Sequence, residues 1–147
     1  MLPEWLHGSI QRQSMFPSTT ISMAIDRPYK DIYAFLSDPA TLPLWTEGLL
    51  HAALTPVSEW VWATLHEGRP VTIHFTPPNP LGVLDISVLG DDVLERHYRV
   101  RVFPNGEGTE LCCTVLQSPG EDDAHFASEC EWLRTDLNVL RAFLEGR

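Results

Sequence analysis

The chain has 147 residues, which is the length of a single domain able to bury a substantial core. Its hydrophobic share of 44% and charged share of 20% are ordinary for a globular protein. The formal net charge of -10 disfavours binding to nucleic acid or to an anionic membrane surface, because both repel an acidic protein.

The chain begins with a segment that shows no regular period. Residues 1–18 mix apolar and polar side chains, and we interpret them as an N-terminal extension. The folded domain is expected to cover residues 19–147. It opens at residues 19–26, where apolar residues alternate with small or polar ones, and this period of two predicts a half-buried strand.

Two short helices are predicted next. Asp26 stands shortly before Pro28, a pattern typical of an N-cap followed by the first turn of a helix. Residues 37–39, Ser-Asp-Pro, end this helix and cap a second one that runs to about Gly48.

Six strand-like runs follow, separated by turns rich in Gly, Pro, Asn and Asp. Short runs with this punctuation predict an antiparallel meander. We place the strands near residues 49–56, 59–67, 70–76, 82–89, 93–103 and 109–117.

The period changes after residue 120. Apolar residues are then spaced by four and three alternately, which is the pattern of one long amphipathic helix. A helix of about 22 residues would be roughly 33 Å long, enough to lie along a sheet. The residues of this stripe are Phe126, Cys130, Leu133, Leu137, Leu140 and Leu144, with Trp132, Val139 and Phe143 expected to widen it.

These elements predict the α+β fold class in a helix-grip arrangement. The expected order is one strand, two helices, six strands and one helix. A bent antiparallel sheet of about seven strands would surround the long C-terminal helix. Such an arrangement leaves room for an apolar ligand between sheet and helix.

The segment from residue 20 to 48, TISMAIDRPYKDIYAFLSDPATLPLWTEG, resembles the opening of the START-like or SRPBCC superfamily. Two later segments, residues 79–85 (NPLGVLD) and 101–106 (RVFPNG), resemble its bacterial polyketide cyclase/dehydratase-like branch. The resemblance covers residues 19–145 and implies the helix-grip fold with a cavity for a hydrophobic molecule. In that branch a His follows the Asp that matches Asp85, whereas this chain has Ile86.

The face of the sheet that would meet the helix collects most of the expected ligand contacts. Simple core packing is the alternative for each of these residues, and for Trp62 packing against a second subunit or the N-terminal extension is another. The candidate ligand-binding residues are Trp45, His51, Trp62, Ile86, Tyr98, Val100, Cys113 and Trp132.

Four residues are candidates for acid–base catalysis. A tight turn at residues 90–92 would place Asp85 roughly opposite His97 on neighbouring strands, where a carboxylate can orient an imidazole. Arg101 would share their face, and His74 stands alone in an apolar run. The alternative is a solvent-side pair for Asp85 and His97, and a buried neutral imidazole with one partner for His74.

No motif predicts a metal or another cofactor. The six histidines lack the HxxxH spacing, and the three cysteines form no CxxC motif. An odd number of unpaired cysteines favours a reduced, cytoplasmic setting. Residues 1–18 lack the basic start and continuous apolar stretch of a signal peptide, and no apolar run reaches the roughly 18 residues of a membrane span.

Three functions remain open on these grounds. The first is binding of a hydrophobic small molecule, either aromatic or polyketide-like, in an internal cavity. The second is an enzyme of the cyclase or dehydratase kind that uses acid–base groups in the pocket. The third is a protein-interaction module. A homodimer is also expected, because exposed Trp residues and a free sheet edge favour pairing.

Overall fold

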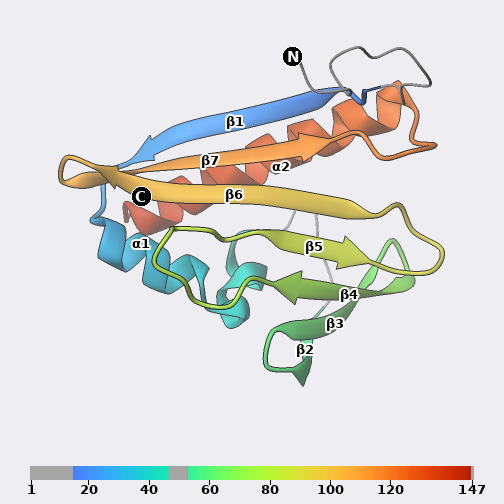
Figure 1. Cartoon of the computed structure of the whole chain (residues 1–147), viewed down its shortest axis with the longest axis horizontal. Coiled ribbons are helices and arrows are strands. Elements are labelled where there is room, and N and C mark those ends of the chain that lie inside the picture. The colour runs from blue at the N-terminus through green and yellow to red at the C-terminus, as the bar shows by residue number, and fades with distance from the viewer. Residues whose placement is uncertain (1–14, 47–52, 147) are drawn as a thin grey trace, which may run out of the picture.

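The computed structural model describes residues 15–46 and 53–146. Their strands form one antiparallel sheet of seven strands in the order β1-β7-β6-β5-β4-β3-β2 (Figure 1). The elements are β1 (Ser18–Ile25), α1 (Tyr29–Leu36), the 3-10 helix η2 (Pro39–Leu44), β2 (Thr55–Ser58), β3 (Val61–His66), β4 (Arg69–Phe75), β5 (Ile86–Leu89), β6 (Arg96–Asn105), β7 (Gly108–Leu116) and α2 (Asp123–Leu144).

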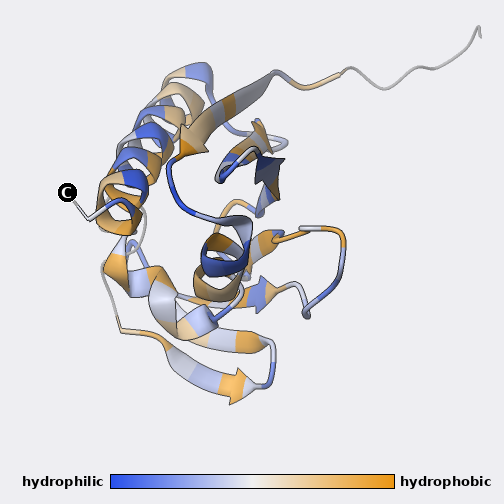
Figure 2. Cartoon of the chain, turned by 90° about the vertical axis from the view of Figure 1, so that its left-hand side faces the viewer, coloured by the Kyte–Doolittle hydropathy of each residue, from blue (hydrophilic) through white to orange (hydrophobic). Residues whose placement is uncertain are grey.

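The sheet bends around α2, as the predicted helix-grip fold requires. Figure 2 looks along the strands and shows the sheet curving, with α2 running along its concave side. The α+β class, the seven strands and the long C-terminal helix are confirmed. No helix in the described ranges is long and apolar enough to cross a membrane.

The first strand shows why the period of two was informative. Ile21, Met23 and Ile25 are buried, whereas the residues between them are exposed. β1 pairs with β7, and Ile21 lies opposite Cys113 across the ladder. The same-face neighbours on both strands therefore build one apolar layer of the core.

The predicted cap of the first helix is wrong. Pro28, not Asp26, occupies the N-cap position of α1, and no side chain caps this helix. Asp26 lies three residues before Tyr29, too early for its carboxylate to reach the free N–H groups of the first turn. The predicted cap of the second helix is confirmed, because the backbone N–H of Ala40 donates to Asp38 Oδ1 at 3.0 Å.

β5 is shorter than predicted, because it begins at Ile86 whereas the expected strand covered residues 82–89. Residues 77–85 form a loop, and Asn79 organises it. Its Oδ1 accepts hydrogen bonds from the N–H groups of Leu81 and Val83, while its Nδ2 donates to the carbonyls of Pro77 and Val83. An isolated antiparallel bridge between Val83 and Arg101 still joins this loop to β6. The predicted strand at 49–56 is found at Thr55–Ser58, and its first residues lie outside the described part.

The apolar stripe of α2 is confirmed in its centre and narrower than expected at its sides. Five of its residues are buried against the sheet: Phe126, Cys130, Leu133, Leu137 and Leu140. Trp132, Val139 and Phe143, expected to widen the stripe, are each about half exposed. Asp122 caps the helix by accepting a hydrogen bond from the N–H of His125 at 2.7 Å.

Gly82 shows how closely the loop before β5 approaches β6. Its carbonyl accepts a hydrogen bond from Val102 N–H, and its φ of 69° lies in the left-handed region. A Cβ at this position would lie 2.0 Å from the carbonyl oxygen of Val102. Gly106 has a similar φ of 59° with no atom near such a Cβ.

We predict that Gly82→Ala destabilises the fold far more than Gly106→Ala. Both substitutions impose a left-handed conformation on alanine, which costs about 1–2 kcal/mol. Gly82→Ala adds a backbone clash that should bring its total to roughly 3 kcal/mol or more. Urea unfolding of the two variants and the parent chain measures the difference. Equal decreases in the free energy of unfolding for the two variants would contradict the close approach of Gly82 to Val102.

Candidate functional site

A cavity of about 320 Å³ lies between the concave face of the sheet and α2. Its apolar walls come from the strands, from α2 and from the short helices near residue 42. The main apolar lining consists of Leu42, Trp45, Ile86, Val88, Val100, Leu111, Cys113, Leu133, Leu137 and Leu140. Space is therefore left over after the core has packed.

Polar side chains line the cavity at the end where the β3–β4 turn and the start of α2 meet. They come from segments far apart in the sequence: His66, Glu67, Arg69, Asp92, Arg96, His125 and Glu129. The walls of the cavity are thus mainly apolar, most of its charged groups gather where the β3–β4 turn meets α2, and Asp38 lines it from the start of η2.

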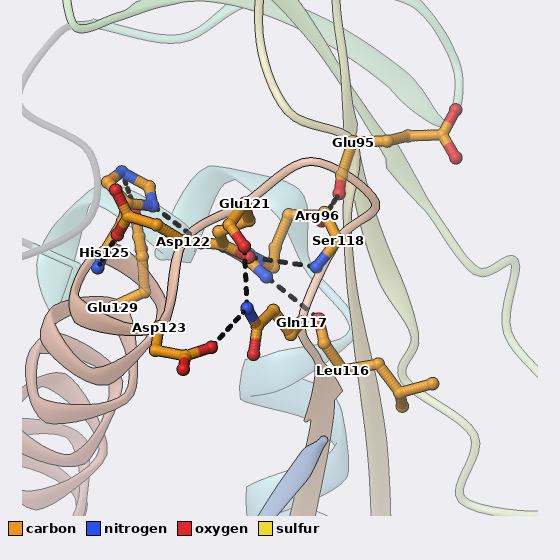
Figure 3. A network of polar contacts seen from close by, with 10 residues as sticks. All are labelled: Glu95, Arg96, Leu116, Gln117, Ser118, Glu121, Asp122, Asp123, His125 and Glu129. Atoms are coloured by element: carbon orange, nitrogen blue, oxygen red, sulfur yellow. Dashed lines mark hydrogen bonds and ion pairs between the residues drawn. The ribbon is translucent and has the colours of Figure 1, made fainter. Parts of the chain in front are cut away.

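A buried ion pair organises this polar end (Figure 3). Arg96 Nη2 lies 2.5 Å from Glu121 Oε2, and both side chains are almost fully buried. Arg96 Nη1 also donates to the carbonyl of Leu116, while the other carboxylate oxygen of Glu121 accepts from Ser118 N–H. The pair therefore joins the start of β6 to the β7–α2 connection.

The charge state of Glu121 follows from these contacts. Burial alone would raise the pKa of its carboxyl group, but hydrogen bonds from Arg96, Ser118 N–H and His125 outweigh burial and hold the pKa below its ordinary value. The hydrogen bond to Glu121 in turn raises the pKa of His125. Glu121 is therefore ionised near neutral pH, and His125 donates one of the three hydrogen bonds that it accepts.

Two cavity residues remain neutral. Burial, followed by the nearby charge of Glu129, raises the pKa of the Tyr98 phenol. Burial likewise raises the pKa of the Cys113 thiol to about 12, so the thiolate needed for nucleophilic attack is scarcely populated. Cys113 is thus a small apolar residue in the wall of the cavity.

Of the eight candidate ligand-binding residues, five line the cavity: Trp45, Ile86, Tyr98, Val100 and Cys113. His51 lies outside the described residues. Trp62 is half-buried opposite Ile73 and does not line the cavity. Trp132 lies on the solvent side of α2 with 52% of its surface exposed, because it falls off the stripe that faces the sheet.

The four acid–base candidates do not line the cavity. The predicted pairing of Asp85 with His97 is wrong, since Ser87 lies opposite His97. The turn between the strands is longer than assumed, because residues 90–95 all lie outside the strands. Asp85 instead contacts Arg99 at 3.5 Å and Arg101.

His97 and His74 belong to the same outer face of the sheet. The Nδ1 atom of His97 lies 2.7 Å from Ser87 Oγ, and its Nε2 lies 3.0 Å from Glu95. His74 is partly buried and lies opposite Ser87, with its Nε2 3.0 Å from Thr72 Oγ1. This face is therefore a ladder of polar partners turned away from the cavity.

Sequence reasoning missed the polar end of the cavity. His66, Glu67 and Glu129 place ligand atoms within 4.8 Å of one another, a grouping that could hold a metal ion. One local signal was present, because His125 and Glu129 are four residues apart and share a helix face. Their proximity to the β3–β4 turn depends on the tertiary structure and has no counterpart in the spacing.

No protein-family model matches this sequence, and no curated protein sequence matches it either. Solved structures do match. A START superfamily protein from Mycobacterium smegmatis superposes with a TM-score of 0.71 at 13% identity, over 88% of this chain and 97% of that one.

Two further structures are similar over most of their length. CalU16 from Micromonospora echinospora has a TM-score of 0.61 at 17% identity, covering 88% of this chain and 74% of that one. The major latex-like protein 151 of Panax ginseng has a TM-score of 0.62 at 11% identity, covering 89% and 99%. These likenesses show that the chain has the START-like fold, which confirms the resemblance at the level of the fold.

We predict that Glu121→Gln lowers the free energy of unfolding by about 3–5 kcal/mol near neutral pH, because it leaves the Arg96 charge buried without a carboxylate. The folded pKa of Glu121 lies below its ordinary value of 4.5, so its contribution is present above that pH. It is lost as the pH falls through the folded pKa, and the variant and the parent should then converge.

Chemical unfolding across the acid range measures this convergence. Asp31→Asn serves as the control, because it removes an ion pair with Arg27 in which both side chains are half exposed. Asp31→Asn should lower the free energy of unfolding by less than about 1 kcal/mol. A Glu121→Gln deficit that stays constant with pH would argue against a stabilising ionised pair.

Proposed function

We propose that the protein binds a hydrophobic small molecule, of aromatic or polyketide-like shape, in the cavity between the sheet and α2. The observation that carries the proposal is the cavity itself, about 320 Å³ in volume and walled by apolar side chains. Sites for small molecules are typically of about 300–1,000 Å³, mostly apolar, with a few polar groups that orient the ligand.

One polar group suggests a feature of the ligand. Trp45 lines the cavity, and its Nε1 is buried without a hydrogen-bond partner among the described residues. A buried donor left without a partner costs about 1–3 kcal/mol. A ligand oxygen that accepts this hydrogen bond would remove the cost, so we favour an apolar molecule that carries at least one acceptor.

The phenol of Tyr98 adds a second polar contact in the cavity. It lines the same space and remains protonated, because its pKa is raised by burial and by Glu129. A neutral phenol can donate a hydrogen bond to a carbonyl or ether oxygen without adding charge to the cavity. Together with Trp45, it favours an uncharged ligand body.

An enzymatic role in the cyclase or dehydratase class receives less support from the geometry. Such a role was expected to use Asp85, His97, Arg101 or His74, all of which lie on the outer face of the sheet. A ligand within the cavity would be out of hydrogen-bond reach of these groups, and proton transfer needs that reach.

The first test is native mass spectrometry of the purified chain, followed by denaturing extraction of any molecule that remains bound. A co-purifying apolar compound would support the proposal and reveal its chemical class. An uncharged naphthylamine dye then serves as a probe in fluorescence titrations. A chain that carries no molecule and also fails to bind the dye would contradict the proposal.

We predict that Val100→Phe weakens dye binding by at least about tenfold, because the larger side chain fills part of the cavity. Val139→Phe is the matched control, since it makes the same chemical change on α2 where Val139 is 46% exposed. The control should bind the dye like the parent chain. Equal affinities of the two variants would place the dye outside the cavity.

A further inference from the structure

His66, Glu67 and Glu129 converge on one point although they are far apart in the chain. His66 and Glu67 lie at the β3–β4 turn, and Glu129 lies on the second turn of α2. One ligand atom from each lies within 4.8 Å of the others. From this convergence we propose that the three side chains, together with His125, bind a divalent transition-metal ion, for which Zn²⁺ is the best fit.

The spacing of the donor atoms is close to what a metal ion requires. Zinc binds imidazole nitrogen and carboxylate oxygen at about 2.0–2.2 Å, so two donors on one tetrahedral ion lie about 3.4 Å apart. The ligand atoms of His66, Glu67 and Glu129 lie within 4.8 Å of one another, so modest rotations of the side chains would suffice. A pair of carboxylates with imidazoles favours zinc or a similar ion over Mg²⁺ or Ca²⁺.

A hydrogen bond with Glu121 holds the ring of His125 beside Glu129 (Figure 3). Its Nδ1 lies 2.6 Å from Glu121 Oε2, and its Nε2 lies 3.9 Å from Glu129 Oε1. A metal-binding imidazole commonly donates one N–H to a carboxylate, which leaves the other nitrogen free for the metal. Glu121 is itself held by its ion pair with Arg96, and this pair therefore also fixes the orientation of the His125 ring.

The charges at this end of the cavity also favour a cation. Within the described ranges, neither Glu67 nor Glu129 forms an ion pair with Lys or Arg. Arg96 is paired with Glu121, and Arg69 lies 4.0 Å from Asp92. His125 is the ionisable partner of Glu129, at 3.9 Å, and a divalent ion would relieve the repulsion that remains between the carboxylates of Glu67 and Glu129.

The backbone at Glu67 is unusual for the residue that occupies it. Glu67 has a φ of 53°, and no other residue except glycine has a positive φ in the described ranges. Tight hairpin turns of this kind prefer Asn, Asp or Gly at such positions. Residues with a strained backbone cluster at functional sites. Binding of the metal by the Glu67 carboxylate would be such a function.

The proposed site borders the cavity but does not depend on a ligand there. All four side chains line the cavity, so coordination positions that the protein leaves open would face it. If the proposed small molecule also binds, one of its oxygen atoms could complete the coordination. Metal binding is measurable without that molecule, and the two proposals can therefore fail separately.

The test is isothermal titration calorimetry of the EDTA-treated full chain with ZnCl₂ and, separately, MgCl₂. We expect saturable zinc binding at one ion per chain and no comparable binding of magnesium. Titration with Co²⁺ should give the visible absorption of a low-coordinate site with nitrogen and oxygen donors. Absence of saturable zinc binding would overturn the proposal.

Matched variants locate the ion. His66→Ala and Glu129→Gln should each weaken zinc binding by at least about tenfold. His74→Ala and Glu131→Gln are the controls, because His74 lies on the outer face and Glu131 is exposed on α2. Circular dichroism verifies that each variant is folded, and Glu67→Gln replaces any that is not. Equal affinities of all variants would show adventitious surface binding and overturn the proposal.

A final arm separates this proposal from the proposed function. Val100→Phe should retain zinc binding, because Val100 is a wall residue with no ligand atom. If the protein binds zinc but no apolar molecule, the metal-site proposal is supported and the proposed function is contradicted. The reverse result would refute the metal site alone.

Discussion

The buried ion pair between Arg96 and Glu121 is the interaction on which the candidate site depends. It fixes the start of β6 against the β7–α2 connection and so sets where α2 begins. The same carboxylate orients His125, and α2 then carries Glu129 to the β3–β4 turn. This pair adds a directional contact to the β6–β7 ladder and to the hydrogen bond from Ser118 Oγ to the carbonyl of Glu95, whereas apolar packing is not directional.

The bend of the sheet explains why the cavity persists. α2 packs through a narrow stripe centred on Leu133, Leu137 and Leu140, while its flanking residues face solvent. A single helix with so narrow a stripe cannot fill the concave side of a seven-stranded sheet. The remaining volume is walled by β5, β6 and β7, and charged side chains gather where the β3–β4 turn meets α2. A ligand bound there would be oriented by this cluster of charged groups.

Patterns confined to one element were predictable from the sequence, and relations between elements were not. The alternation in β1 and the spacing along α2 identified both elements, because each pattern reflects a face turned toward the core. The pairing of Asp85 was missed because the length of the turn at residues 90–95 sets the register. Likewise, inward-facing positions such as Val100 were found, whereas the approach of Glu129 to His66 required the complete fold.

The pairing of the first and last strands has a consequence for the order of folding. Among the described strands, β1 (Ser18–Ile25) pairs with β7 (Gly108–Leu116) alone, so this edge of the sheet joins segments about ninety residues apart. During synthesis β1 emerges from the ribosome long before β7 has been made. Until then its apolar face has no partner strand to pack beside. Closing so long a loop is entropically costly and slows folding. This edge of the sheet is therefore expected to form late, after the β6–β7 hairpin is present.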